Sequence, residues 1–368
     1  MKLGVDVSTY LEEKNGGAKY FDHGKEIDPF REMRANGVDL IRLRVWNDPF
    51  ENGKPYLGGT NSVENDLKII EDLKPYGFSY IIDFHYSDFW VDPGKQTLPK
   101  AWKGLSFEEV KEQLYLFTKE SLQKFKNAGV DAPYIQIGNE VTNGMVWPFG
   151  QLIDNGKGKP RSNYEGFIAL LNSGIKGAKE IYPNSQIIVH LERSSDCEVY
   201  EELFTQLKEA DVPYDVIGMS YYPYWHGNFA QLFKNVANCQ QKFQKPIMIM
   251  ELGYGFTLED YLLTENGQSE LKVTKENLEA ELPYDIDIKG QELFIEDFLD
   301  RCEQHHVLGV IYWEPLWIPG ETICWASVEG QAYIHEEGKP TRNEWSNQCL
   351  FDYKGNKLPA FNKYRIKK

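Results

Sequence analysis

The segment 28–46, DPFREMRANGVDLIRLRVW, contains one complete unit of the pattern that decides the fold. Its first half, Asp28–Asn36, has helical spacing and stops at Gly37, a residue type that commonly ends a helix. Its second half, Leu40–Trp46, is a short run of apolar and β-branched residues, which is typical of a buried strand. A helix that leads directly into such a strand indicates a parallel sheet with crossover helices.

The same alternation continues along the whole chain. Seven further short apolar runs are predicted as strands: Lys2–Ser8, Tyr80–Tyr86, Tyr134–Val141, Gln186–Glu192, Val216–Tyr222, Pro246–Leu252 and Val307–Trp313. Stretches with helical spacing lie between them: Asn65–Tyr76, Phe107–Ala128, Tyr164–Ile181, Val199–Glu209, Phe229–Phe243 and Gln291–His305. A last short segment near Asn343–Gln348 could close the ring.

Eight strands, each followed by a helix, predict a (β/α)8 TIM barrel of the α/β class. No repeat, low-complexity tract or linker marks a boundary in the sequence, so we expect residues 1–368 to form one catalytic domain with elaborated βα loops. The rival architecture, a doubly wound open sheet, normally carries a glycine-rich phosphate turn after its first strand. Here that strand runs into Asp6-Val7-Ser8-Thr9-Tyr10, and the barrel is favoured.

Composition narrows the class of partner. The chain has 40 Lys and Arg against 56 Asp and Glu, and its formal net charge of −16 argues against binding to nucleic acid or to an anionic membrane. No apolar run approaches the roughly 20 residues that cross a bilayer. The first residues lack the apolar core of a secretory signal, so the sequence predicts a cytoplasmic protein, or a secreted or cell-surface one if a leader has been removed. We expect a monomer.

Metal and cofactor sites are not indicated by the sequence. The five cysteines are far apart and never form a C-x-x-C pair, so neither a disulfide framework nor a zinc knuckle is predicted. The sequence contains no His-x-His and no His-Glu-x-x-His, the spacings that a metal-dependent barrel hydrolase would use. We therefore predict no metal and no required cofactor.

The carboxyl ends of the strands carry the chemistry in a barrel of this type. Eight of the nine tryptophans fall at these ends or in the loops behind them: Trp46, Trp90, Trp102, Trp147, Trp225, Trp313, Trp317 and Trp325. The exception is Trp345. Aromatic rings suit the apolar faces of sugars and neighbouring polar groups suit their hydroxyls, although simple packing of the loops is the alternative. The residues expected to bind substrate at this rim are Arg44, His85, Asp88, Trp90, Asn139, His190, Tyr221, Tyr222, Trp313 and Trp317.

Two carboxylates stand out within the rim, because Glu140 and Glu251 each end a strongly apolar strand. The fourth and seventh strands lie on opposite sides of an eight-stranded ring, so these side chains can face each other across its mouth. Glycoside hydrolysis needs such a pair, with one carboxyl protonated beside the leaving oxygen and one ionised on the other face of the anomeric carbon. A separation of roughly 5 Å would retain configuration, and a wider gap would invert it.

The neighbours of the two glutamates complete this hypothesis. Asn139 is a suitable hydrogen-bond donor to a sugar 2-hydroxyl. Tyr222 or Tyr221 is expected to hold an ionised Glu251 and keep its pKa low. Arg44 is expected to add positive potential beside the nucleophile.

The chain resembles family 53 of the glycoside hydrolases, the endo-β-1,4-galactanases, almost from end to end. The motifs that carry the resemblance are 41–49 (IRLRVWNDP), 83–93 (DFHYSDFWVDP), 99–102 (PKAW), 136–140 (QIGNE), 220–223 (SYYP), 312–315 (YWEP) and 345–352 (WSNQCLFD). The resemblance implies that Glu140 is the acid/base and Glu251 the nucleophile. It further implies retaining hydrolysis of β-1,4-galactan, a side chain of pectin, so that galactan or galacto-oligosaccharide is the partner.

Three features depart from the pattern of that family. Leu252 follows the second glutamate where a threonine is usual, and Glu192-Arg193 replaces a small polar run, which predicts a reshaped wall of the cleft. The loop Gly255–Lys289 lacks the alternating Asp and Asn that would hold calcium there, so structural calcium is not supported. Two alternatives stay open, namely hydrolysis of another β-1,4-linked polymer such as mannan or xylan, and carbohydrate binding without catalysis.

Overall fold

The computed structural model describes residues 1–156, 161–274, 278 and 282–366. Eight parallel strands form a closed barrel in the order β1-β14-β13-β12-β11-β8-β7-β4, and β4 pairs with β1 to complete the ring. The strands are β1 (Lys2–Asp6), β4 (Val38–Val45), β7 (Ser79–Phe84), β8 (Tyr134–Ile137), β11 (Gln186–Leu191), β12 (Val216–Tyr221), β13 (Ile247–Leu252) and β14 (Gly309–Trp313). The predicted (β/α)8 barrel is confirmed, and each of the eight predicted runs supplies one of its strands.

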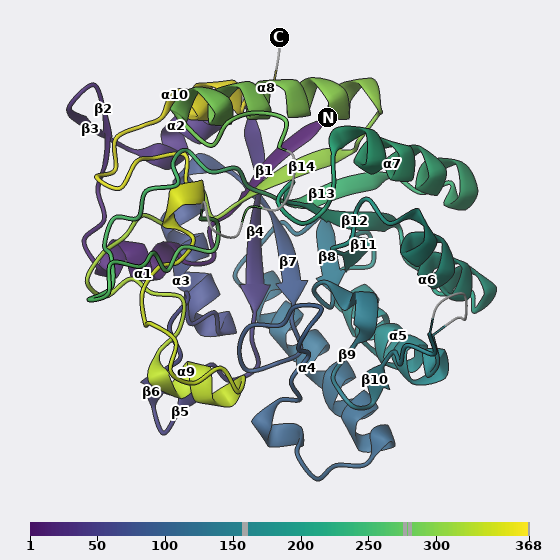
Figure 1. Cartoon of the computed structure of the whole chain (residues 1–368). Helices are drawn as coiled ribbons and strands as arrows, with labels where there is room; N and C mark the ends of the chain where they lie inside the picture. The colour runs from purple at the N-terminus through teal and green to yellow at the C-terminus, as the bar shows by residue number, and fades with distance from the viewer. Residues whose placement is uncertain (157–160, 275–277, 279–281, 367–368) are drawn as a thin grey trace.

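Helices surround the ring of strands (Figure 1). Those that follow barrel strands are α2 (Pro29–Ala35), α3 (Val63–Leu73), α4 (Phe107–Asn127), α5 (Tyr164–Ile181), α6 (Cys197–Glu209), α7 (Phe229–Phe243), α8 (Ile288–Gln304) and α10 (Pro359–Lys363). The loops after β1 and β14 contain two short helices that the sequence did not predict, α1 (Tyr10–Asn15) and α9 (Val328–Tyr333). No helix in the described part of the chain is long and apolar enough to cross a membrane.

Smaller elements elaborate the loops. They are the hairpins β2/β3 (Tyr20–Asp22, Lys25–Ile27), β5/β6 (Phe50–Glu51, Lys54–Pro55) and β9/β10 (Gly144–Met145, Gly150–Gln151), and the 3-10 turns η1 (Lys74–Tyr76), η2 (Lys100–Trp102), η3 (Val141–Asn143) and η4 (Ser346–Gln348). The predicted helix Asn65–Tyr76 divides into α3 and η1, because Pro75 lacks the N–H that a continued α-helix would need.

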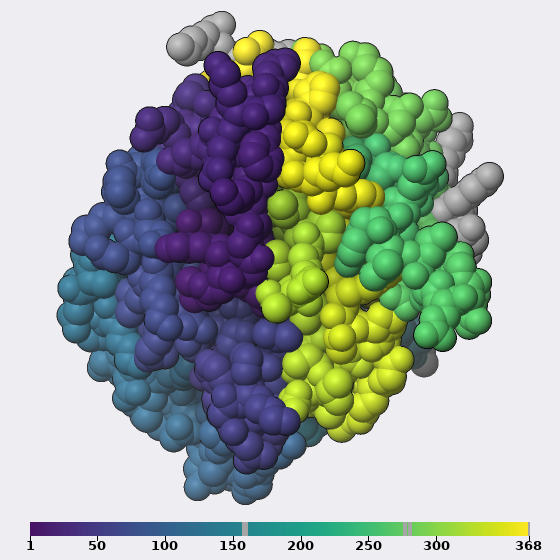
Figure 2. Space-filling view, turned by 90° about the vertical axis from the view of Figure 1, so that its left-hand side faces the viewer, coloured from purple at the N-terminus to yellow at the C-terminus, as the bar shows by residue number. Residues whose placement is uncertain are grey.

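The ring closes differently from the prediction. The predicted closing segment Asn343–Gln348 contains only the buried single turn η4, whereas α10 lies beside α8 on the outside of the barrel (Figure 1). Tyr364, directly after α10, places its hydroxyl oxygen 2.6 Å from Gly4 O and 2.7 Å from Val310 O. The end of the chain is thereby tied to β1 and β14, and Figure 2 shows the N-terminal and C-terminal parts of the chain side by side along one face.

The interior of the barrel is apolar over most of its lower part, towards the amino ends of the strands. The side chains that fill it form one cluster: Leu40, Ile81, Tyr134, Ile188, Val216, Met248, Met250 and Ile311. A second, larger apolar layer lies between the strands and the helices. With the lower interior filled, substrate can approach only from the carboxyl ends of the strands.

Tyr364→Phe should destabilise the fold by about 1–3 kcal/mol, because it removes a buried hydroxyl whose hydrogen is shared between two carbonyl oxygens and which accepts from the N–H of Tyr312. Urea unfolding followed by circular dichroism measures this change. Tyr115→Phe is the matched control, since its hydroxyl bonds Glu180 near the surface, and it should cost less than about 0.5 kcal/mol. Equal losses in the two variants would contradict the role given to Tyr364.

Candidate active site

The upper interior of the barrel is polar. Side chains alternate between the two faces of a strand, so Leu40, Arg42 and Arg44 of β4 all face inward. The neighbouring strands contribute further buried polar side chains: Asp6, Asp83, Gln136, His190, Ser220 and Glu251. Charged and amide groups therefore lie directly above the apolar cluster, at the open end of the barrel.

A cavity of about 360 Å³ lies at this open end. Six tryptophans line it: Trp90, Trp225, Trp313, Trp317, Trp325 and Trp345. Trp345 was the one tryptophan not expected at the rim. It lies there because the segment before η4 folds back over the strand ends, and the centroid of its ring is 4.8 Å from that of Trp313. Trp46, Trp102 and Trp147 lie outside the cavity.

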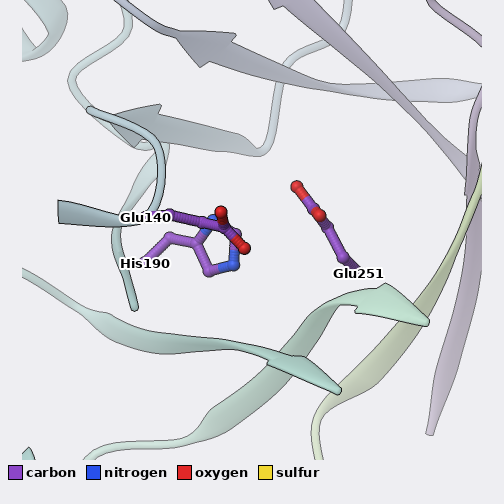
Figure 3. A group of neighbouring side chains, drawn as sticks. All are labelled: Glu140, His190 and Glu251. Atoms are coloured by element: carbon purple, nitrogen blue, oxygen red, sulfur yellow. The ribbon is translucent and has the colours of Figure 1, made fainter. Parts of the chain in front are cut away.

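Glu140 and Glu251 face each other in this cavity from opposite sides (Figure 3). An oxygen of one carboxyl lies within 4.8 Å of an oxygen of the other. β8 ends at Ile137, before the predicted Val141, because Gly138 (φ 79°) and Glu140 (φ 48°) take left-handed backbone conformations. This turn aims Glu140 across the mouth, and the short separation matches the geometry of a retaining glycosidase.

Glu251 is held by two donors. Arg42 Nη1 donates to Glu251 Oε1 at 2.9 Å, and the hydroxyl of Tyr222 donates to Oε2 at 2.9 Å. The prediction that Arg44 stands beside Glu251 is wrong, because Arg44 lies one layer higher and pairs with Glu314 at 2.7 Å. Arg44 nevertheless lines the cavity.

The two facing carboxyls differ in their surroundings. Burial raises the pKa of Glu140 well above its ordinary value, and the charges of Glu251 and Glu192 raise it further. Burial also raises the pKa of Glu251, but Arg42 and Tyr222 act in the opposite direction. A proton shared by the pair therefore resides on Glu140 and leaves Glu251 ionised.

Asn139 and His85 also line the cavity, as predicted. Asn139 Oδ1 accepts from Arg42 Nη2 at 2.8 Å, and its amide nitrogen donates one hydrogen to Val91 O at 3.3 Å, which leaves the other for a sugar hydroxyl. His85 Nδ1 accepts from Trp46 Nε1 at 3.1 Å, so Nε2 carries the hydrogen and donates to Asp83 at 3.1 Å. Burial lowers the pKa of His85, which keeps the ring neutral.

Three predicted binding residues lie outside the cavity: Asp88, Tyr221 and His190. The Asp88 carboxylate accepts from the backbone N–H groups of Asp48 at 3.0 Å and Lys100 at 2.7 Å, so it joins two loops and is not offered to a ligand. Tyr221 points outward and stacks on Phe298 at 5.4 Å. Because adjacent residues of a strand face opposite sides, only the next tyrosine along the chain can reach the site.

His190 lies beside Glu140 and does not line the cavity (Figure 3). Its Nε2 is 2.9 Å from Ser220 Oγ, and its Nδ1 is 3.0 Å from Asn139 Oδ1. In the described residues, Glu140, His190 and Glu251 are the one group of three side chains close enough to share a metal ion. Both ring nitrogens of His190 already contact polar partners, so we assign no metal site here.

The departures from the family pattern lie at identifiable places. Glu192 lines the cavity and accepts from the hydroxyl of Thr142, whereas Leu252 is buried in the apolar layer. In the loop 255–289, residues 275–277 and 279–281 lie outside the described residues. The described part is held by Arg342, whose Nη2 contacts Asp260 at 2.6 Å.

Three site residues were not predicted from the sequence: Arg42, Ser220 and Trp345. Arg42 could have been found, because it shares the inward face of β4 with Arg44, two residues later. The same spacing relates Ser220 to Tyr222. Trp345 belongs to a long loop whose path the strand pattern does not fix, and its one signal in the sequence is that it begins the family motif 345–352.

Known proteins resemble this chain in both sequence and architecture. The family model described as glycosyl hydrolase family 53 matches residues 2–364. The chain belongs to this family. Endo-beta-1,4-galactanase of Bacillus subtilis (strain 168) is 33% identical and aligns with 97% of this chain and 83% of its own length. Arabinogalactan endo-beta-1,4-galactanase of Cellvibrio japonicus (strain Ueda107) is 31% identical, with coverages of 98% and 89%.

A solved structure agrees as well. The GH53 catalytic domain of Ignisphaera aggregans superposes with a TM-score of 0.87 at 34% identity, over 98% of this chain and 94% of that one. The family suggested by the motifs is therefore confirmed over essentially the whole sequence.

Tyr222→Phe should raise the pKa of Glu251 by about 1 unit, because it removes a hydroxyl that donates to the ionised carboxylate. Carbon-13 NMR of the side-chain carboxyl groups measures this pKa without substrate. Tyr221→Phe removes the neighbouring hydroxyl, which bonds Gly227 O, and should leave the titration of Glu251 unchanged. The same shift in both variants would contradict the choice between the two tyrosines.

Proposed function

We propose that this protein is a retaining β-1,4-galactanase, with Glu140 as acid/base and Glu251 as nucleophile. The observation that carries the proposal is the facing pair of carboxyls, whose nearest oxygens are within 4.8 Å and whose surroundings favour one protonated and one ionised member. Inverting enzymes hold their carboxyls about 6.5–9.5 Å apart to admit water, and this pair is closer. The galactanase names of the relatives support the choice of galactan.

In the first half-reaction, a carboxylate oxygen of Glu251 attacks the anomeric carbon of the bound galactosyl unit. The bond from that carbon to the glycosidic oxygen breaks, and Glu140 donates its proton to the departing oxygen. Arg42 and Tyr222 keep Glu251 ionised and oriented while it attacks. The products are a free sugar hydroxyl end and a glycosyl ester of Glu251.

In the second half-reaction, water takes the place of the departed sugar. Glu140, now ionised, accepts a proton from this water as the water oxygen attacks the anomeric carbon. The ester bond to Glu251 breaks, which restores both carboxyls to their starting states. Two successive inversions leave the configuration of the sugar unchanged.

The walls of the cavity suit a neutral sugar polymer. Six indole rings provide flat apolar surfaces, and galactose presents a continuous patch of C–H groups on one face because its 4-hydroxyl is axial. The polar groups at the floor can bond the hydroxyls of a ring that is stacked in this way. Mannan and xylan are less favoured, since the named relatives in the family are galactanases.

The substrate assignment predicts a clear order of initial rates on a polysaccharide panel. Linear β-1,4-galactan should give the fastest release of reducing ends, with at least a 10-fold lower rate on mannan and xylan because a hydrogen-bonded pocket discriminates against a misplaced hydroxyl. A higher rate on mannan or on xylan would identify that polymer as the substrate in place of galactan. Nuclear magnetic resonance of the first product should show retained β configuration.

The roles of the two glutamates are tested on the same substrate. Glu140→Gln should lower kcat on galactan by about 10²–10⁴-fold, the usual contribution of an acid/base, and Glu251→Gln should leave only background activity. Glu165→Gln, a surface change in the first turn of α5, is the control and should retain the full rate. Oligosaccharide binding with no turnover by the unmodified protein would favour a carbohydrate-binding role.

We also propose that hydrolysis needs no cofactor, because the chain itself supplies both reacting groups. In the loop 255–289, the guanidinium of Arg342 already brings positive charge to the buried Asp260 carboxylate. Treatment with EDTA, followed by dialysis into metal-free buffer, should therefore change neither the rate on galactan nor the thermal midpoint. A lower midpoint that Ca²⁺ restores would contradict this.

A further inference from the structure

The acid/base Glu140 has a buried hydrogen-bond partner that does not reach the substrate. Ser220 Oγ lies 2.6 Å from Glu140 Oε1. Ser220 belongs to β12, is fully buried and does not line the cavity. Any influence of this hydroxyl on the reaction must therefore pass through Glu140.

A second buried side chain holds the serine. His190 Nε2 lies 2.9 Å from Ser220 Oγ. Burial and the charge of Arg42 lower the pKa of His190 well below its ordinary value, so the ring is neutral and carries one hydrogen. Which nitrogen carries that hydrogen decides the direction of the whole chain of hydrogen bonds.

The contacts of Nδ1 favour the hydrogen on Nε2. Asn139 Oδ1, 3.0 Å from Nδ1, already accepts from Arg42 Nη2 at 2.8 Å and from Gln136 Nε2 at 3.1 Å. Gln136 Nε2 gives one hydrogen to Gly138 O at 3.0 Å, so its second hydrogen is shared between Asn139 Oδ1 and Nδ1, which is 3.2 Å away. A hydrogen on Nδ1 would meet this shared hydrogen, so Nδ1 is the acceptor of the ring.

We propose that His190 and Ser220 form a buried positioning relay for the acid/base, in which His190 Nε2–H donates to Ser220 and the Ser220 hydroxyl donates to Glu140 Oε1. This deepens the proposed function and rests on it. The relay occupies Oε1, so Oε2 is the oxygen that gives the proton to the leaving group and later takes a proton from water. No proton moves along the relay during the reaction.

The relay matters because Glu140 needs two opposite states in one cycle. Burial of Glu140 and the negative charges of the neighbouring carboxylates both favour the protonated acid that the first half-reaction requires. Esterification of Glu251 removes one of these charges in the second half-reaction, and the hydroxyl of Ser220 is the hydrogen-bond donor that favours the carboxylate required there. The titratable and charged groups that face this position are Arg42, Asp92, His190, Glu192, Tyr200, Tyr222 and Glu251.

Ser220→Ala removes the donor and should raise the pKa of Glu140 by about 1 unit. Two measurements report this. Carbon-13 NMR of the carboxyl group gives the pKa without substrate, and the basic limb of the kcat/KM profile on galactan, which requires protonated Glu140, should move to higher pH by the same amount. An unmoved or lowered pKa would overturn the proposal.

The second half-reaction supplies a kinetic test. With dinitrophenyl β-1,4-galactobioside the leaving group needs no proton, so hydrolysis of the glycosyl–enzyme limits the rate. Ser220→Ala should lower kcat on this substrate by up to about 10-fold on the acidic limb of its pH profile, because a pKa raised by about 1 unit leaves less of Glu140 ionised to act as base. Azide attacks without a base and should restore the rate, with glycosyl azide as product. A loss that azide does not restore would show a merely structural role.

Three comparisons separate the relay from general damage and from failure of the substrate assignment. Ser194→Ala is the matched control, because that serine is also buried and its hydroxyl has no hydrogen-bond partner among the described residues, and neither the pKa nor the kinetics should change. Ser220→Thr keeps a hydroxyl and should keep the pKa of Glu140 near that of the unmodified protein. Nitrogen-15 NMR of the unmodified protein should show His190 as the Nε2–H tautomer, and the Nδ1–H tautomer would overturn the relay. These NMR results stand even if galactan proves not to be the substrate.

Discussion

One buried guanidinium organises the open end of the barrel. Arg42 contacts Asp6 at 3.0 Å, Asp83 at 2.8 Å, Glu251 at 2.9 Å and Asn139 at 2.8 Å, and these partners come from four different parts of the ring. Removing ions from water costs several kcal/mol for each, so such a cluster persists only where every member is bonded. The contacts that close the upper barrel are therefore the same contacts that orient the nucleophile. Loss of Arg42 would leave three buried carboxylates facing one another.

The asymmetry of Glu140 and Glu251 follows from that placement. Both carboxyls are removed from water, which by itself favours the neutral form of each. The guanidinium of Arg42 contacts Glu251, whereas Glu140 faces a further carboxylate, Glu192. The position of Arg42 thus decides which glutamate of the pair carries the proton, because two glutamates do not differ intrinsically. The departure from the family pattern at Glu192 strengthens this assignment.

The sequence predicted the barrel because buried parallel strands are continuous apolar runs and because glycines mark several helix ends. It predicted Glu140 and Glu251 because an acid that ends such a run has to lie at the mouth. It did not decide between Tyr221 and Tyr222, because either could face inward until the inward face of β12 is known. The structure puts Val216, Ser220 and Tyr222 on that face and Tyr221 on the other. Alternation put Arg42 on the correct face, but its height relative to Glu251 depends on the stagger of distant strands.

The aromatic wall and the polar floor are one mechanical unit. Arg44 lies over the ring of Trp90 at 4.1 Å while its guanidinium pairs with Glu314, and Trp90 Nε1 donates to Trp325 O at 2.9 Å. A sugar platform that is bonded to the strand ends keeps a fixed distance from the carboxyls below it. Rigid platforms lose little conformational entropy when a ligand binds, so stacking energy can be used to place the anomeric carbon over Glu251. The rim tryptophans thus contribute to catalysis by fixing where the sugar ring lies, and not by affinity alone.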